Sequence, residues 1–208
     1  MSASKTASLL PPDTADSLFE TKSVTVMVVN LFYDKPNMVG HSGFGYLIPK
    51  SVPLEQNPHR ALGVIFDSDA MPGQDAREGT KVTVMLGGHW WDGNSSFPSE
   101  EEGLLMAKEV LQHHLGITEQ PVETMASLHM DCIPQYGVGH AGRLRQVHED
   151  LMDKMGGRLV VAGNSYGGVG LNDCVRSARD AAFGVAGGRR MTGLERWAFE
   201  EAWVSKDL

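Results

Sequence analysis

The sequence predicts a mixed α/β fold whose first part is an antiparallel or mixed sheet. Four strand-like segments follow one another between residues 23 and 87, and the loops that join them carry no helical pattern, which is typical of antiparallel strands. Amphipathic helical patterns follow in the second half of the chain. The last long one comes directly after an apolar segment and a glycine-rich turn, which is typical of a ligand-binding α/β domain.

The strand-like segments have the composition and period of β-structure. Residues 23–32 are apolar and β-branched at successive positions, so we expect a central strand covered on both faces. Val82, Val84 and Leu86 alternate along one face of the fourth segment. The glycines of the second segment suggest a bulge or a close approach by another group. The expected strands are residues 23–32, 43–49, 62–67, 81–87 and 125–132.

Capping signals predict where the helices begin. Ser99 and Glu102 form a capping-box pattern before the first helix, which Gly116 ends. Thr192 and Glu195 repeat the pattern before a last helix, and residues 16–19 suggest a single helical turn in a mobile lead-in. The apolar stripes of the two middle helices are Leu104, Ala107, Leu111 and Leu115, then Leu144, Val147, Leu151 and Met155.

The strongest local signal for a ligand site is the glycine-rich stretch at residues 163–174. We expect residues 159–162 to form a buried strand and a helix to begin within 169–173, with Val175, Ala178, Ala182 and Val185 on one apolar face. The free N–H groups of such a helix start favour a negative or strongly accepting ligand. An ordinary strand-to-helix turn has the same glycines, and the pattern leaves the two interpretations equally open.

Composition excludes several classes of function. The net charge is −8, so an extended nucleic-acid surface is not expected. Only two cysteines are present, Cys132 and Cys174, which argues against a disulfide framework and a cysteine zinc site. No apolar run reaches the roughly 20 residues that span a bilayer. The N-terminal residues resemble neither a signal peptide nor a transit peptide.

Three motifs are weaker than they first look. Residues 137–142 match G-x-G-x-x-G, but the acidic residue that a dinucleotide fingerprint requires is missing from residues 159–163. Ser165 resembles a nucleophile elbow, but no histidine follows it. His113 and His114 suit a solvated helix face, and His129 and His140 lack partners at metal-ligand spacing. With no metal site and no acid–base pair, the sequence favours redox chemistry carried by a cofactor.

Six ordered motifs together resemble oxygen-dependent protoporphyrinogen oxidase, in its C-terminal portion. The resemblance covers about residues 23–185. The motifs are Val28–Leu31, Gly43–Pro49, Gly63–Ser68, Val82–Gly88, Cys132–Tyr136 with Gly139 and His140, and Ala162–Cys174.

This resemblance implies an FAD flavoprotein with an amine-oxidase-like fold that oxidises protoporphyrinogen IX to protoporphyrin IX with O2 in haem biosynthesis. It implies that Val169, Gly170 and Leu171 contact the flavin, and a helix start there would stabilise negative charge on the reduced ring. It also implies that Phe44, Leu47 and Met85 line the tetrapyrrole pocket. It identifies no catalytic residue and no metal.

The resemblance also implies a longer enzyme than this chain. Family members begin with a genuine G-x-G-x-x-G loop for the FAD pyrophosphate and carry a membrane-binding segment, and this chain matches neither. We therefore expect an oxidase that is inactive as this isolated chain. The alternatives are a non-catalytic fragment or complementing half and, further, an amine-oxidase-type flavoenzyme. The expected partners are protoporphyrinogen IX and O2, and the expected assembly is a homodimer or a pair with a complementing half. The mitochondrial inner membrane is expected by resemblance only. The expected domains are a lead-in (1–22), a substrate-domain portion (23–135), the last part of a Rossmann-like FAD domain (136–190) and a C-terminal helix or tail (191–208).

Overall fold

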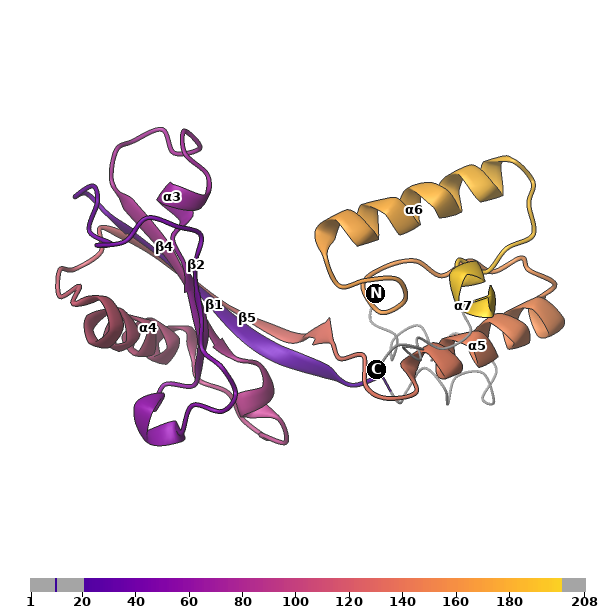
Figure 1. The fold of residues 1–208 in the computed structure, drawn as a ribbon, viewed down its shortest axis with the longest axis horizontal. Helices are drawn as coiled ribbons and strands as arrows, with labels where there is room; N and C mark the ends of the chain where they lie inside the picture. The colour runs from indigo at the N-terminus through magenta and orange to yellow at the C-terminus, as the bar shows by residue number, and fades with distance from the viewer. Residues whose placement is uncertain (1–9, 11–20, 200–208) are drawn as a thin grey trace, which may run out of the picture. The chain divides into compact units, whose positions relative to one another are not determined.

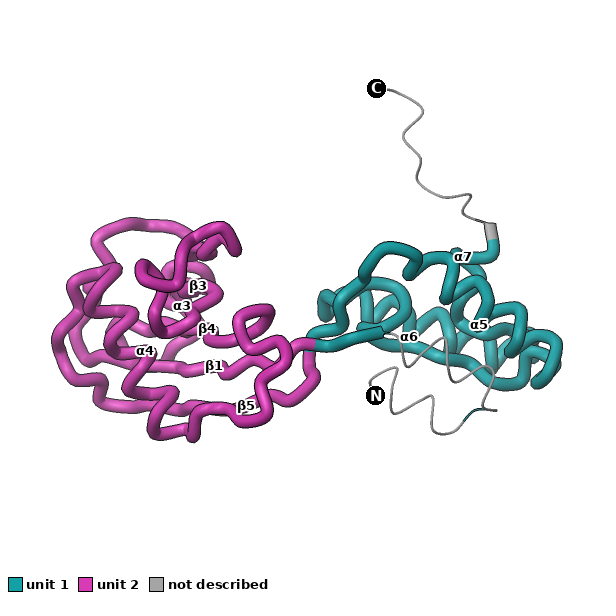
Figure 2. The backbone as a smooth tube through the Cα atoms, turned by 90° about the horizontal axis from the view of Figure 1, so that it is seen from below, with its two compact units in different colours: residues 1–23, 133–208 teal, residues 24–132 magenta. Residues whose placement is uncertain are grey.

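Residue 10 and residues 21–199 are described in the computed structural model of the chain, Phe199 by its backbone alone. The helical turn expected at residues 16–19 lies outside these residues. Figure 2 shows two compact units: unit 1 comprises residues 1–23 and 133–208, and unit 2 comprises residues 24–132. Unit 2 is therefore contiguous in sequence, whereas unit 1 is drawn from both ends of the chain.

Unit 2 is built on a five-stranded sheet of order β2-β3-β4-β1-β5 (Figure 1). The pairs β1–β4, β2–β3 and β3–β4 are antiparallel. β5 runs opposite to β1 as well, because Val122 N–H donates to Phe32 O at one end and Gln135 N–H donates to Lys22 O at the other. The expected strands and the antiparallel arrangement are thus confirmed. The strands are β1 (Ser23–Tyr33), β2 (Gly45–Leu47), β3 (Ala61–Ile65), β4 (Thr80–Gly87) and β5 (Glu123–Pro134).

Helix α4 (Glu100–Leu115) covers one face of the sheet and closes the core of unit 2. The alternating residues of β4 are fully buried there with the apolar stripe of α4; the set includes Val82, Val84, Leu86, Ala107 and Leu111. The expected capping box is confirmed, because Ser99 Oγ accepts from Glu102 N–H at 3.2 Å and Ser99 N–H donates to the Glu102 carboxylate at 2.7 Å. Gly116 ends the helix in the left-handed conformation.

The opposite face of the sheet is only partly covered. Met27, Val29 and Leu31 of β1 are buried, whereas Val28, Asn30 and Phe32 between them are half-buried. The expectation that β1 is fully covered on both faces is therefore wrong. The physical reason is the position of the helix: α4 lies over the side of Met27, Val29 and Leu31. Val28, Asn30 and Phe32 therefore lie on the side that α4 does not cover, where Val26 is the only buried residue of β1.

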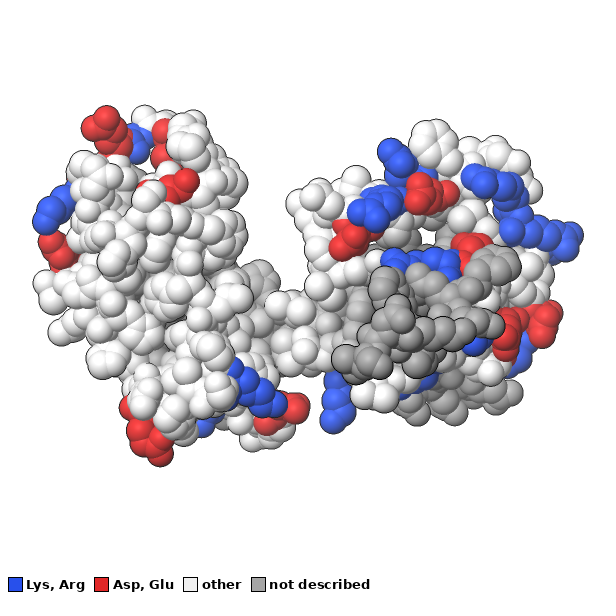
Figure 3. Space-filling view, in the orientation of Figure 1, with Lys and Arg blue, Asp and Glu red and all other residues white. Residues whose placement is uncertain are grey.

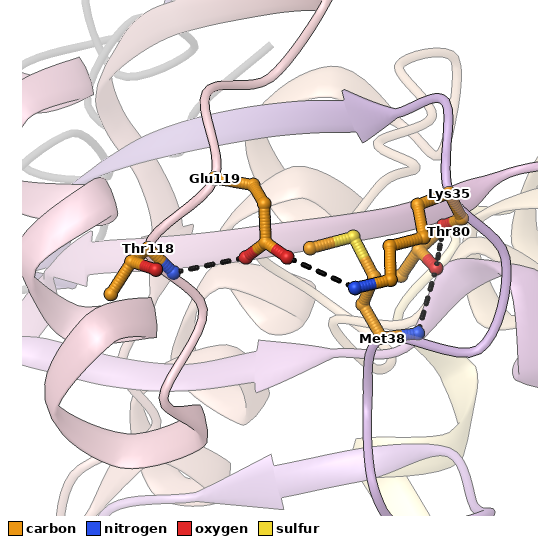
Figure 4. A network of polar contacts seen from close by, with 5 residues as sticks. All are labelled: Lys35, Met38, Thr80, Thr118 and Glu119. Atoms are coloured by element: carbon orange, nitrogen blue, oxygen red, sulfur yellow. Dashed lines mark hydrogen bonds and ion pairs between the residues drawn. The ribbon is translucent and has the colours of Figure 1, made fainter.

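A small polar network joins the turn after β1 to the start of β4 and to the loop after α4 (Figure 4). Lys35 pairs with Glu119 at 3.1 Å, and Thr118 N–H donates to the same carboxylate at 3.2 Å. Thr80 Oγ1 donates to Lys35 O and accepts from Met38 N–H. These hydrogen bonds and the ion pair hold the strand ends together beside the core, against which Met38 packs. Three short helices complete unit 2: η1 (Leu54–Gln56), α3 (Asp67–Ala70) and η2 (Gly88–Trp91).

Unit 1 packs helices around a second, smaller core. The helices in the described part of unit 1 are α5 (His140–Met155), α6 (Leu171–Ala186) and α7 (Glu195–Phe199). The stripe expected on α5 is confirmed, because Leu144, Val147 and Leu151 are all at most 1% exposed. This core also contains Val161, Tyr166 and Leu194. The second capping signal is present too: Thr192 N–H donates to the Glu195 carboxylate at 2.7 Å, although α7 itself begins at Glu195.

The strand expected at residues 159–162 is not formed. Val161 is buried and its N–H donates to Thr192 O at 2.8 Å, but the segment has no strand assignment. A strand needs a ladder of hydrogen bonds with a neighbour, and in the described part of unit 1 this segment is not part of any sheet. The strand–loop–helix argument for a ligand site therefore loses its first element, and the expectation for residues 169–171 now depends on the resemblance and on α6.

Helix α6 begins at Leu171, within the expected interval, but its apolar side is exposed. Leu171 is 79% exposed, Val175 59% and Val185 61%, while Gly184 is the buried residue of the helix and packs near Met191. The helix is amphipathic as expected, but no other element in the described part of unit 1 packs against its apolar side. None of the described helices is both long and apolar enough to cross a membrane. In the view of Figure 3, the charged side chains of unit 2 lie mainly toward its edges around an uncharged middle, and unit 1 shows both acidic and basic side chains.

Candidate functional site

The open face of the sheet brings two of the expected pocket residues into one row. Leu47 pairs with Gly63, Gly63 pairs with Met85, and Met85 pairs with Val28. Directly paired residues in an antiparallel sheet point to the same side. Since Val64 and Val84 are buried toward α4, the neighbouring positions 63 and 85 lie on the other, open face. Leu47 and Met85 are therefore on the same face, with Gly63 between them.

Gly63 keeps the middle of this row flat. A Cβ at this position would lie 2.3 Å from Tyr46 O and 3.1 Å from Leu47 Cδ2, so no larger residue fits without moving β2. Leu47 is 77% exposed and Met85 is half-buried. Phe44 precedes β2, is 72% exposed, and its carbonyl accepts from Phe66 N–H at 2.9 Å. Exposed large apolar side chains beside a flat row are the kind of surface that binds a flat apolar ring or a partner.

Polar side chains lie one step along the same face, and sequence analysis missed them. The next row is Ile65, Thr83 and Asn30, in register with the first. Thr83 Oγ1 lies 2.8 Å from Asn30 Oδ1 and 2.7 Å from Asp67 Oδ2. The available signals were a single asparagine within the apolar residues of β1 and an aspartate directly after β3, but their pairing depends on register.

The loop before α6 is held by hydrogen bonds from three aromatic or basic side chains. Gly168 N–H donates to Tyr136 Oη at 3.1 Å, and the Tyr136 hydroxyl donates to Asn164 O. Arg196 donates to Gly167 O at 2.9 Å, and Trp197 Nε1–H donates to Tyr166 O at 2.7 Å. These contacts fix the backbone that leads into the helix, so a rigid loop presents residues 169–171.

Residues 169–171, which the resemblance assigns to a flavin contact, are exposed at the start of α6. Val169 is 50% exposed, and Gly170 is the N-cap of α6. The first N–H groups of a helix have no partner within the helix and carry partial positive charge. Asp173 lies in the first turn and opposes that charge, but it is paired with Arg176 at 3.3 Å. Exposed donors beside apolar side chains suit the polar edge and flat face of a flavin.

His140 is buried at the start of α5, and neither nitrogen of its imidazole ring has a hydrogen-bond partner among the described residues. Its ring stacks on Tyr136 with centroids 4.0 Å apart. Burial lowers the pKa of His140 to about 4, and the neighbouring Arg143 adds to the shift. The imidazole is thus neutral at neutral pH and acts as an aromatic support for Tyr136, which in turn holds the loop before α6.

Stability of unit 1 is expected to fall as the pH drops below the ordinary pKa of histidine, about 6.5. The folded pKa of His140 is depressed, so the unfolded chain binds the proton first, and the contribution to stability is lost between about pH 6.5 and 4. Between pH 7 and 5 the loss should be about 2 kcal/mol, measured by urea unfolding. His140→Phe keeps an aromatic ring against Tyr136 and should remove that part of the slope; an identical slope in wild type and variant would contradict the assignment.

The remaining candidates do not form a second chemical site. His113 is exposed as expected, but the expectation for His114 is wrong: it is half-buried and its Nδ1 lies 2.7 Å from the Tyr46 hydroxyl. Cys132 and Cys174 form no disulfide with the described residues, and the Cys132 thiol donates to Val24 O at 3.6 Å. Among residue 10 and residues 21–199, no three His, Cys, Asp or Glu side chains are placed to hold a metal ion. The G-x-G-x-x-G match follows a strand of unit 2 but opens a helix of unit 1, unlike a dinucleotide-binding βαβ unit.

No family model matches the chain, but individual proteins do. It is 39% identical over 165 residues to protoporphyrinogen oxidase of Schizosaccharomyces pombe, and 38% identical over 192 residues to that of Homo sapiens. These matches cover 78% and 89% of the chain. The chain resembles protoporphyrinogen oxidase. The motifs quoted from the sequence therefore belong to a similarity that runs through most of the chain.

A solved structure supports the same fold. The crystal structure of a protein from Exiguobacterium, assigned as a protoporphyrinogen oxidase, superposes with a TM-score of 0.71 at 23% identity over 91% of this chain and 40% of that one. A coproporphyrinogen III oxidase of Mycobacterium leprae is 31% identical over 99 residues, which is 48% of this chain. The chain spans only 33% and 39% of the length of the yeast and human protoporphyrinogen oxidases that it matches.

Proposed function

We propose that this chain supplies the tetrapyrrole-binding sheet and the flavin-facing helix start of an oxygen-dependent protoporphyrinogen oxidase. The row Leu47–Gly63–Met85 supports the first part, because it places an exposed leucine and a half-buried methionine on either side of a glycine on an open sheet face. A porphyrinogen would lie on this row, with its apolar ring faces out of water, and contact with Phe44 is proposed from the resemblance alone. Binding energy would come mainly from burial of apolar surface.

The cofactor in this proposal is FAD, with its ring against Val169, Gly170 and Leu171. When bound, FAD would accept the hydrogen equivalents removed from protoporphyrinogen IX, and O2 would reoxidise it with release of hydrogen peroxide. The chain's own contribution is to position the ring: the fixed loop and the N–H groups of α6 would stabilise negative charge at the ring edge. Val169 and Leu171 would exclude water from its face.

A second candidate function is a non-catalytic fragment or complementing half. The exposed apolar side of α6 favours it, since a soluble monomer seldom leaves such a side uncovered. We propose that the covering element is the part of a protoporphyrinogen oxidase that this chain does not match. An amine-oxidase-type flavoenzyme is a further alternative, and preference for polyamines over protoporphyrinogen in a complete chain would favour it.

Site of action, oxygen use and assembly follow only by analogy. We propose that the complete protein acts at the mitochondrial inner membrane, uses O2 as its oxidant, and forms a homodimer or a complemented pair. Fractionation of the full-length parent protein would test the location, since recovery in the cytosol would overturn it.

Protoporphyrin IX is expected to bind unit 2 on its open face. Leu47→Glu should weaken binding at least about tenfold, because it places a charge in the apolar row, a change of about 1.4 kcal/mol or more. Leu105→Glu is the matched control: this leucine is 60% exposed on α4, away from the row. Quenching of porphyrin fluorescence measures both. Equal affinity of the two variants, or no binding by the wild-type chain, would contradict the proposed site.

A further inference from the structure

The polar row beside Met85 is a chain of hydrogen bonds that ends in a carboxylate. A threonine hydroxyl has one proton, yet the oxygen of Thr83 lies within hydrogen-bond distance of the side chains of Asn30 and Asp67. The two ends of an asparagine amide are not distinguished by heavy-atom positions. The consistent arrangement has the Asn30 amide donating to Thr83, and the Thr83 hydroxyl donating to Asp67. Asn30 and Thr83 thereby fix the direction of the Asp67 carboxylate.

Asp67 lies within reach of a ring seated on the proposed tetrapyrrole row. Thr83 and Met85 are two residues apart on β4, so they share the open face about 7 Å apart. The Asp67 carboxylate is 2.7 Å from Thr83 and half-buried, where a charge is screened less than at the surface. Lys81, two residues before Thr83 on this face, is paired with Asp75 at 3.2 Å, so its ammonium group is engaged by a carboxylate other than that of Asp67.

Porphyrinogens differ in how many negative charges they would bring to this position. Protoporphyrinogen carries two propionates, on adjacent pyrroles, so it can turn its uncharged edge toward Asp67. Coproporphyrinogen carries a propionate on every pyrrole, so no orientation keeps its carboxylates away from that side. Like charges brought together in a partly desolvated site repel strongly.

We propose that Asp67, positioned by Thr83 and Asn30, is a specificity-determining residue that selects a two-propionate porphyrinogen and disfavours a four-propionate one. The inference rests on the proposed tetrapyrrole site. The names of the relatives mention two porphyrinogens, protoporphyrinogen and coproporphyrinogen III. Repulsion by Asp67 would distinguish between these two substrates. The same repulsion sets the orientation of the accepted substrate, with its propionates on the far side from Asp67.

The test compares binding of protoporphyrin IX and coproporphyrin III to the 208-residue chain by fluorescence quenching. Asp67→Asn removes the charge and keeps an oxygen that accepts from Thr83. It should strengthen coproporphyrin III binding at least about fivefold and change protoporphyrin IX binding less than about twofold. The preference of the wild-type chain for protoporphyrin IX over coproporphyrin III should shrink in high salt, whereas the ratio of the two affinities in Asp67→Asn should not change.

Asp69→Asn is the matched control, because it removes an equal charge from the same short helix. The Asp69 carboxylate accepts from Gly43 N–H at 3.2 Å and is not part of the Thr83 chain, so this variant should keep the wild-type preference. Thr83→Val should reduce the preference by releasing Asp67. An unchanged preference in Asp67→Asn, with both porphyrins bound, overturns the inference alone. Failure of the wild-type chain to bind either porphyrin overturns the proposed site and the inference with it.

Discussion

On its own, the chain is expected to bind FAD roughly a thousandfold or more weakly than it does together with the remainder of a protoporphyrinogen oxidase. Residues 169–171 offer contacts for the flavin end, and no described βαβ unit offers the pyrophosphate a helix start. Each charge-assisted hydrogen bond to phosphate contributes about 1.5–3 kcal/mol. Three such bonds exceed about 4 kcal/mol together, which gives the expected ratio.

The measurement is the visible spectrum of bound flavin after purification, with and without co-expression of the part of the Schizosaccharomyces pombe protein that this chain does not match. Flavin and oxygen-dependent porphyrin fluorescence are expected only in the second case. Val175→Glu is the informative variant: this side chain is 59% exposed, so the chain alone should keep its stability within about 0.5 kcal/mol, while co-purification should be lost. Stoichiometric flavin on the chain alone would refute the prediction. Residues 137–142 would then have to be reconsidered as a phosphate-binding loop.

Gly87→Ala is expected to lower the free energy of unfolding of unit 2 by about 2–5 kcal/mol. Gly87 has a φ of +94°, which favours glycine, and a Cβ there would lie 2.1 Å from the ring of Trp91. That ring is buried in the core and cannot swing away at low cost. Backbone strain and overpacking therefore add.

Gly93→Ala separates these two causes. Gly93 has a φ of +78°, and a Cβ there would have no neighbouring atom within 4 Å, so this variant should lose only the strain, about 1–2 kcal/mol. Urea unfolding followed by near-ultraviolet circular dichroism measures both variants. Equal losses would show that the contact with Trp91 contributes nothing.

Local signals predicted the elements of this protein well, and their failures share one cause. The capping box at Ser99 and the stripe on α5 depend on residues within one or two turns, so the sequence contains all that they need. Residues 159–162 have the composition of a strand but not a neighbouring strand among the described residues, and composition cannot supply one.

The candidate site shows the same limit. Recognition of the family motifs pointed to Leu47 and Met85, but the flat row between them depends on Gly63, which only the register brings there. Thr83 and Asn30 are 53 residues apart in sequence, and His114 meets Tyr46 across 68 residues. Contacts between residues so far apart in sequence form only when the strands pair and a helix packs against the sheet. No periodicity in a single segment records them.

The division of the chain also has a consequence for its synthesis. Residues 24–132 form unit 2 without interruption, so the sheet and α4 can leave the ribosome complete and begin to fold while the C-terminal third is still being made. The core residues Leu144, Val147, Leu151 and Leu194 of unit 1 are translated afterwards. A nascent chain that stalls after residue 132 has left the ribosome would thus carry a complete unit 2 and an unfinished unit 1.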